Sequence, residues 1–214
     1  RVGVLDLTQG EMGTRGTPET RAREARAASR ALGLHHRENL GLPDSALEPT
    51  RSTILSVAAR LRALRPRVVI LPYWEGRHPD HVAAGHIGYR ACYLAGLAKL
   101  DLGAPPATAG RPHRPRKVLY ALLFDVGKQA LPSFIVDITR DYKRRARAIA
   151  CYRSQFDAPR MQRGVHIPLT GLEERLDAVC RYYGSLVGVR YGEPFLTREL
   201  MPVDDVLQLP GRSL

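Results

Sequence analysis

Two histidines and an aspartate lie within four residues, His78-Pro79-Asp80-His81, directly after an apolar run. Neutral imidazole binds zinc, and catalytic zinc sites use about three protein ligands together with a water molecule. A histidine that does not bind the metal can protonate a leaving group or stabilise an oxyanion, and a nearby carboxylate can fix its orientation. The three side chains therefore indicate metal-assisted hydrolysis. The plainer alternative is that Asp80 only caps a helix, and the motif supplies at most two ligands.

The elements on both sides of this motif place it where active sites are common. The run 67–74 (RVVILPYW) is continuously apolar and predicts a strand buried on both faces, and a helix is expected from the motif to about residue 98. In open α/β sheets, functional groups gather at the carboxyl ends of strands. His78 and His81 are three residues apart, so they share roughly one face of the first helical turn.

A second group of charged residues follows the strand predicted over 2–7. The loop TQGEMGTRGT (8–17) is rich in glycine and carries Glu11 and Arg15, but it lacks the G-K-[ST] of a P-loop and the G-x-G-x-x-G of a dinucleotide site. A helix is expected from Thr17 as N-cap to Gly33 as C-cap, with Arg21 in its first turns. Arginine suits carboxylate or phosphate recognition, although solvated surface arginines explain the same pattern.

The remaining elements alternate between strands and helices. We expect a helix over 49–65 that Pro66 ends and an irregular tail over 191–209. The elements between them are loop 101–116, strands 118–124 and 134–138, helix 141–156, loop 157–169 and helix 172–186. This order indicates an α/β fold with a parallel sheet between helices. The 214 residues show no internal repeat and no linker, so a single domain is expected.

Composition limits the classes of function. No apolar run approaches the roughly 20 residues that cross a bilayer, and residue 1 leads straight into a strand pattern, so neither a membrane span nor a signal peptide is expected. The three cysteines form no C-x-x-C pair and suggest reduced thiols in a cytoplasmic protein. The net charge of +12 comes largely from arginines on helical faces. It fits a compositional bias or attraction of a small anionic substrate, with nucleic-acid binding as the alternative that we do not favour.

Taken together, the motifs resemble the LmbE-like, or PIG-L-type, zinc-dependent N-acetylglucosamine deacetylases, and within that family the bacillithiol-biosynthesis deacetylases of the BshB type. The resemblance covers nearly the whole chain. Besides the N-terminal glycine-rich segment, it rests on six stretches in this order: RENLGLPD (37–44), LRPRVVILPYWEGRHPDH (64–81), PHRPRKVLY (112–120), FIVDIT (134–139), AIACYRSQF (148–156) and GEPF (192–195).

The resemblance implies a Rossmann-like, three-layer α/β fold with a mostly parallel sheet. It also implies Zn²⁺-dependent hydrolysis of the N-acetyl group of an N-acetylglucosamine glycoside, GlcNAc-malate in the BshB type, by a homo-oligomer that acts on a small anionic sugar and binds neither nucleic acid nor membrane. Two alternatives stay open: a deacetylase of another GlcNAc conjugate, and a degenerate homologue that binds sugar without catalysis.

The resemblance also assigns roles to individual residues. His81 matches a metal ligand, His78 matches the histidine that assists catalysis, and Asp80 matches the acid that orients it. Arg21 and Arg114 match basic residues that contact the substrate, and two arginines suit the carboxylates of malate. With the two charged residues of the glycine-rich loop, the expected substrate contacts are Arg21, Arg114, Glu11 and Arg15.

The chain departs from the family pattern in two places. A His-Pro-Asp-Asp type of motif, which supplies two zinc ligands and the general base in the family, is absent from the sequence, and VGVLDL corresponds to the family's second strand. We therefore expect an LmbE-like domain over 1–214 that is N-terminally incomplete. His35, His36 and His166 offer no replacement. The connection 125–133 lacks a histidine that some relatives carry, which affects the expected shape of the substrate pocket.

Overall fold

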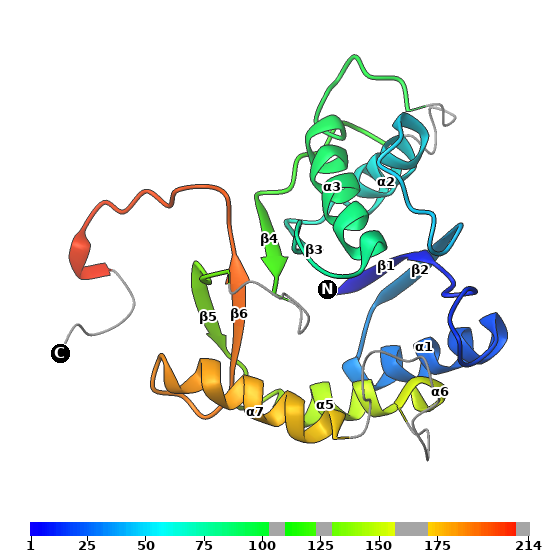
Figure 1. The fold of residues 1–214 in the computed structure, drawn as a ribbon. Coiled ribbons are helices and arrows are strands. Elements are labelled where there is room, and N and C mark those ends of the chain that lie inside the picture. Colours follow the sequence, from blue (N-terminus) through cyan, green and yellow to red (C-terminus); the bar gives the residue numbers. More distant parts are fainter. Residues whose placement is uncertain (103–109, 123–129, 157–170, 209–214) are drawn as a thin grey trace. The chain divides into compact units, whose positions relative to one another are not determined.

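The computed structural model describes residues 1–102, 110–122, 130–156 and 171–208 (Figure 1). They form two compact units. The first unit combines Arg1–Leu47 with Val136–Glu193, and the second combines Glu48–Ile135 with Pro194–Leu214. The α/β architecture is confirmed, whereas the organisation as a single domain stays a prediction. No helix in these ranges is both long and apolar enough to cross a membrane.

In the first unit, strands β1 (Gly3–Thr8) and β2 (His36–Leu42) pair in parallel. Helix α1 (Pro18–Leu32) lies between them in sequence. The hydroxyl of Thr17 accepts a hydrogen bond from the backbone N–H of Thr20, and the helix ends at Gly33 with a φ of 69°. Both predicted helix ends are therefore confirmed, because each depends on local backbone chemistry.

Helices α5 (Tyr142–Ala150), α6 (Arg153–Phe156) and α7 (Leu172–Ser185) complete this unit, and α1 packs against α5 and α6. The single helix predicted over 141–156 is wrong, since α5 ends before Cys151. There the backbone N–H groups of Cys151 and Tyr152 donate three residues back, at 3.3 and 3.0 Å, which tightens the last turn.

The second unit contains helices α2 (Arg51–Leu64) and α3 (Pro79–Leu94) and the parallel strands β3 (Val68–Pro72) and β4 (Lys117–Ala121). Helix α3 packs against α2, β3 and β4. The buried core of the unit includes Leu71, Tyr120, Ile87, Ala91 and Cys92. The three cysteines are free thiols, as expected, and burial raises the pKa of Cys92 to about 12.

The C-terminal part of the chain adds a strand beside β4. Strand β6 (Gly192–Leu196) pairs antiparallel with β4, β5 (Phe134–Asp137) follows it, and the order is β3-β4-β6-β5. The expectation of an irregular tail is wrong here, since Phe195 is buried in register with Ala121. Beyond β6, Val206–Gln208 form one 3₁₀ turn.

Two further expectations for the second unit need correction. Strand β3 is not buried on both faces. Val68 and Ile70 on one face are 48 % and 55 % exposed, whereas Leu71 on the other face is 8 % exposed. Helix α3 ends at Leu94 instead of about residue 98, and the buried guanidinium of Arg62 donates to the carbonyl oxygens that follow, those of Ala95, Leu97 and Leu100. The predicted loop 157–169 and parts of loop 101–116 and strand 118–124 lie outside the described residues.

Candidate active site

The two histidines of the motif lie side by side where helix α3 begins. His78 is the N-cap residue, and its carbonyl oxygen accepts hydrogen bonds from the N–H groups of His81 and Val82 at 3.1 and 3.3 Å. The imidazole rings stack with their centres 4.6 Å apart and their planes at 20°. Both rings belong to exposed residues, so a ligand can reach them.

Asp80 differs from its neighbours because it is buried, with 6 % of its surface exposed. It lies in the first turn of α3, where the helix dipole favours a negative charge. The N-cap position belongs to His78, and the His78 side chain makes no capping hydrogen bond. Asp80 is therefore not the N-cap residue itself, and the helix dipole alone is a structural reason for a carboxylate at this position.

Two glycines let α3 lie close to the strand that precedes it. A Cβ atom on Gly85 would lie 2.7 Å from the carbonyl oxygen of Pro72, and one on Gly88 would overlap the side chain of Leu71. Real Cβ atoms essentially never approach another atom within 3.0 Å. The middle of α3, at Gly85 and Gly88, is thus held close to Leu71 and Pro72 at the end of β3.

The connection between β3 and α3 begins with an aromatic cluster, in which its first two residues, Tyr73 and Trp74, pack with Tyr120 of β4. The Trp74 ring lies 4.4 Å from that of Tyr73 and meets Tyr120 edge-on at 4.6 Å. Tyr120 is 1 % exposed, and its hydroxyl has no hydrogen-bond partner among the described residues. Burial raises the pKa of Tyr120 to about 12.

Arg114 lies at the opposite end of α3. Its guanidinium carbon is 5.0 Å from the ring centre of Tyr93, and a Cβ on Gly96 would lie 2.8 Å from its Nε. Tyr93 follows His78 by 15 residues of helix, which correspond to roughly 22 Å along the axis. The predicted substrate site requires Arg114 close to the two histidines, and the structure does not bring them together.

The other three predicted contacts lie in the first unit, Glu11 and Arg15 in the glycine-rich loop and Arg21 in the first turns of α1. Arg21 reaches back under the loop, since a Cβ on Gly10 would lie 2.5 Å from Arg21 Nη2. The Nη1 atom of Arg15 is buried and has no hydrogen-bond partner among the described residues. Glu11 instead accepts a hydrogen bond from the N–H of Asp44 at 2.7 Å. Arg21 thus packs against the loop, Arg15 is partly buried, and Glu11 helps to fix the shape of the loop.

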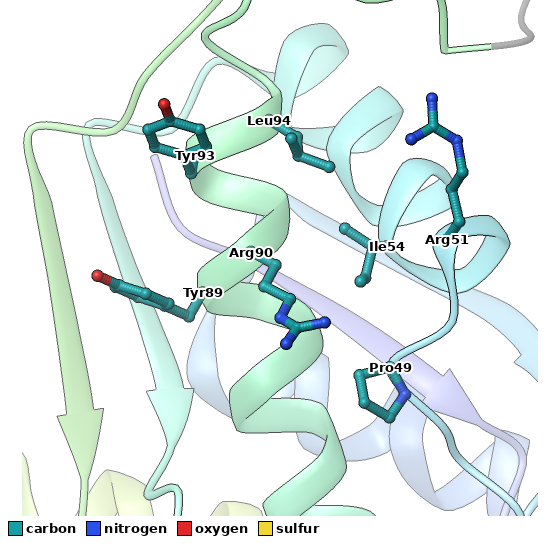
Figure 2. A pocket seen from close by; sticks show the side chains of 7 residues that line it. All are labelled: Pro49, Arg51, Ile54, Tyr89, Arg90, Tyr93 and Leu94. Atoms are coloured by element: carbon teal, nitrogen blue, oxygen red, sulfur yellow. The ribbon is translucent and has the colours of Figure 1, made fainter.

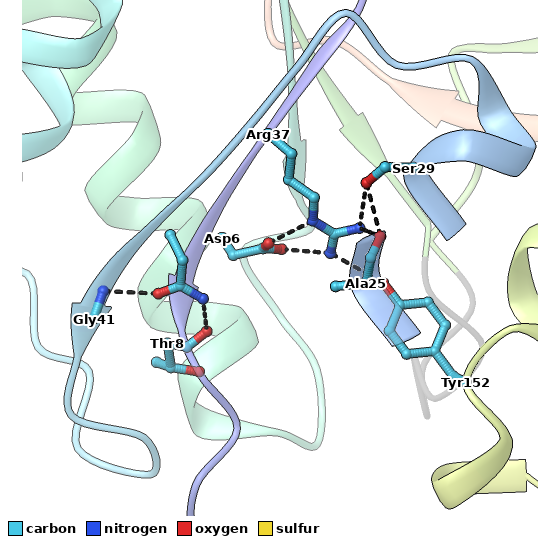
Figure 3. A network of polar contacts seen from close by, with 8 residues as sticks. Asp6, Thr8, Ala25, Ser29, Arg37, Gly41 and Tyr152 are labelled. Carbon is cyan, nitrogen blue, oxygen red and sulfur yellow. Dashed lines mark hydrogen bonds and ion pairs between the residues drawn. The ribbon is translucent and has the colours of Figure 1, made fainter. Parts of the chain in front are cut away.

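A polar network that links β1, β2 and α1 to Tyr152 was not identified from the sequence (Figure 3). Arg37 of β2 forms a bidentate ion pair with Asp6 of β1, at 2.7 and 3.0 Å, and donates to the hydroxyl of Tyr152 at 3.0 Å. Ser154 donates to the buried carboxylate of Glu24 from both N and Oγ, each at 2.7 Å. These contacts join the stretches RENLGLPD and YRSQF, whose polar residues were the available signal.

The described residues contain no complete metal centre. Among them, no three His, Cys, Asp or Glu side chains gather in a geometry that could hold a metal ion. The described residues therefore do not form the three-ligand site that catalytic zinc uses, and we derive no chemical step through a metal from them.

The second unit also contains a pocket between α2 and α3 (Figure 2). Its volume is about 470 Å³, and its lining is mostly apolar with two arginine side chains. None of the predicted site residues lines it, and its residues are Pro49, Arg51, Ile54, Tyr89, Arg90, Tyr93 and Leu94.

Comparison with known proteins gives consistent matches. The model of the family PIG-L, described as GlcNAc-PI de-N-acetylase, matches residues 1–92. The diacetylchitobiose deacetylase of Thermococcus kodakarensis is 27 % identical over 195 residues, which are 89 % of this chain and 67 % of that protein.

Solved structures agree with this match. The conserved protein TT1542 from Thermus thermophilus is 40 % identical, with a TM-score of 0.79 over 94 % of this chain and 83 % of that one. The N,N'-diacetylchitobiose deacetylase from Pyrococcus horikoshii has the same fold, with a TM-score of 0.72, 24 % identity and coverage of 94 % and 73 %.

Proposed function

Because the chain belongs to the PIG-L, or LmbE-like, family of deacetylases, which are amidohydrolases, we propose that it hydrolyses the N-acetyl group of an N-acetylglucosamine-type sugar. The observation that carries the proposal is the pair of exposed, stacked imidazoles of His78 and His81 beside the buried carboxylate of Asp80. Amide hydrolysis needs a group that stabilises the oxyanion and a group that protonates the leaving amine, and a histidine can provide both.

Within this proposal the three residues have different roles. His78 donates a hydrogen bond to the developing oxyanion and a proton to the amine, and Asp80 keeps its imidazole in the required orientation. His81 is the one metal ligand assigned in this chain. Zinc, when bound by a family member, supplies an activated water molecule. The described residues do not gather the remaining ligands, so zinc dependence is part of the proposal.

For the substrate we propose an acidic glycoside such as GlcNAc-malate, which would place the protein in bacillithiol biosynthesis in the cytoplasm. The support is electrostatic: the chain carries a net charge of +12, and Arg15 and Arg21 lie at one loop, with Nη1 of Arg15 lacking a partner among the described residues. A guanidinium group binds a carboxylate in a planar, bidentate geometry.

The test is release of acetate by the purified protein from GlcNAc-malate, GlcNAc-inositol and diacetylchitobiose, with and without a chelator. His78→Ala should lower turnover strongly at normal zinc content, His81→Ala should lose the metal, and Arg21→Ala should mainly raise KM for the acidic glycoside. A His81→Ala enzyme with full activity contradicts the assignment. Sugar binding without acetate release from any of the three substrates would favour a non-catalytic homologue.

A further inference from the structure

Arg198, two residues after β6, places its guanidinium group against three aromatic rings. Its central carbon lies 4.3 Å from the ring centre of Trp74, 4.4 Å from that of Tyr89 and 5.3 Å from that of Tyr120. Trp74 belongs to the connection between β3 and α3, Tyr89 to α3 and Tyr120 to β4. One cation therefore contacts three separate elements of the second unit.

The contacts with the rings are the interactions that hold this side chain. Among the described residues no carboxylate forms an ion pair with Arg198, and the neighbouring Glu199 accepts a hydrogen bond from Thr197 instead, at 2.7 Å. A guanidinium group is planar and weakly hydrated, so it stacks well on aromatic faces. The position of Arg198 is thus coupled to the position of Trp74.

Trp74 is the anchored end of the segment that leads to the histidine pair. It packs between the buried rings of Tyr73 and Tyr120 and the guanidinium of Arg198. The residues that follow it, 75–77, are exposed, and a Cβ on Gly76 would meet nothing within 4 Å. The buried ends of this segment are the aromatic cluster at Trp74 and the first turn of α3 at Asp80.

We propose that Arg198 is a positioning residue for His78 and acts through Trp74. By stacking on Trp74 and Tyr89 together, it fixes the distance between the connection and α3, and this fixes where the His78 imidazole stands. The inference rests on the proposed deacetylase function for its catalytic consequence, but the effect of Arg198 on the connection can be measured without turnover.

The chain contains one tryptophan, so tryptophan fluorescence measures Trp74 alone. In Arg198→Ala we expect stronger quenching of this fluorescence by acrylamide and faster amide hydrogen exchange over 74–78. We expect kcat to fall about tenfold, because misplacing a catalytic group by about 1 Å costs up to about a hundredfold, while KM stays within about twofold. Arg198→Lys, which keeps the charge but not the planar stacking, should recover part of kcat.

Arg190→Ala is the matched control, because Arg190 also stacks on a tyrosine, Tyr191, with its guanidinium carbon 5.4 Å from the ring centre, but in the first unit. It should leave quenching and exchange at Trp74 unchanged. Arg198→Met keeps the bulk and removes the cation, so it should change quenching, exchange and kcat in the same direction as Arg198→Ala. It takes the place of Arg198→Ala in every measurement if that variant does not fold.

Three results would overturn the inference. The first is that acrylamide quenching of Trp74 and amide exchange over 74–78 in Arg198→Ala match those of the wild type. The second is a raised KM with unchanged kcat, which would make Arg198 a substrate contact. The third is full recovery in Arg198→Met, which would show that bulk and not the cation fixes Trp74. If the wild-type protein releases no acetate, the proposed function fails, while quenching and exchange still decide whether Arg198 holds the connection.

Discussion

Replacing Gly85 by alanine tests whether close packing of α3 on β3 stabilises the second unit. The new Cβ would lie 2.7 Å from the carbonyl oxygen of Pro72 and 3.5 Å from that of Tyr73. Both atoms are backbone, so no change of rotamer relieves the contact. Helix α3 must instead move away from β3 by a few tenths of an ångström, against the packing of the core.

The magnitude follows from two opposing effects. Overpacking a close-packed interior costs about 1–3 kcal/mol, and alanine gains about 1 kcal/mol over glycine inside a helix. Because the new Cβ meets backbone atoms, the upper part of that range applies, a cost of about 2–3 kcal/mol. After the gain of about 1 kcal/mol is subtracted, the free energy of unfolding of Gly85→Ala should fall by roughly 1–2 kcal/mol, which lowers Tm by roughly 2–8 °C in a chain of this size. Gly88→Ala should lose less, because its Cβ meets the side chain of Leu71, which can repack.

Urea unfolding followed by circular dichroism measures these differences. Gly76→Ala is the control, since its Cβ would meet nothing within 4 Å, and it should leave the free energy of unfolding unchanged or raise it by up to about 1 kcal/mol. If Gly85→Ala is as stable as wild type, or if Gly88→Ala loses more than Gly85→Ala, the packing argument is refuted.

Three other changes test the polar contacts. Arg37→Met should lower the free energy of unfolding by roughly 2–4 kcal/mol in urea titrations, because it leaves the largely buried carboxylate of Asp6 without its bidentate partner. Tyr120→Phe should leave the free energy of unfolding unchanged at pH 7, since the buried hydroxyl has no partner among the described residues. Burial raises the pKa of Tyr120 to about 12 in the folded state, so the wild type should lose stability between pH 10 and about 12, and Tyr120→Phe should lose less over that range. Hydrogen bonds from Arg181 and Tyr191 lower the pKa of Asp177. The contribution of Asp177 to the free energy of unfolding is therefore fully present above its ordinary pKa and is lost as the pH falls through its lowered pKa. Asp177→Asn should accordingly lose less stability than the wild type when the pH is lowered through this range.

The sequence predicted best those elements whose ends depend on local chemistry. Thr17 and Gly33 define both ends of α1, because a capping hydroxyl and a left-handed glycine act within one turn. The alternation of strands and helices likewise indicated the α/β class. The break after α5 was missed because its cause includes a distant contact, that of Ser154 with Glu24, and no local pattern contains it.

The strand β6 was missed for a related reason. The stretch GEPF contains glycine and proline, which are rare in strands, and it becomes a strand by pairing with β4 in the tertiary structure. The placement of Arg114 also depends on tertiary structure. The residues around Arg114 in sequence do not indicate which end of α3 it lies against. In the structure, the N–H of His113 donates to the carbonyl oxygen of Ala95 at 2.9 Å, which places Arg114 at the C-terminal end of α3.

The histidine pair is the part of the candidate site whose internal geometry the sequence could predict, for a local reason. A spacing of three residues at the start of a helix fixes the relation of two side chains through the helix itself. The relation of that pair to anything else depends on how α3 packs, and here it depends on Gly85 against Pro72 at one side and on Trp74 at the other. If packing sets the position of His78, Gly85→Ala should lower kcat in native conditions, where the protein stays folded. If the connection 74–78 alone sets it, Gly85→Ala should lose stability and keep its kcat, so the two quantities measured on one variant separate the two causes.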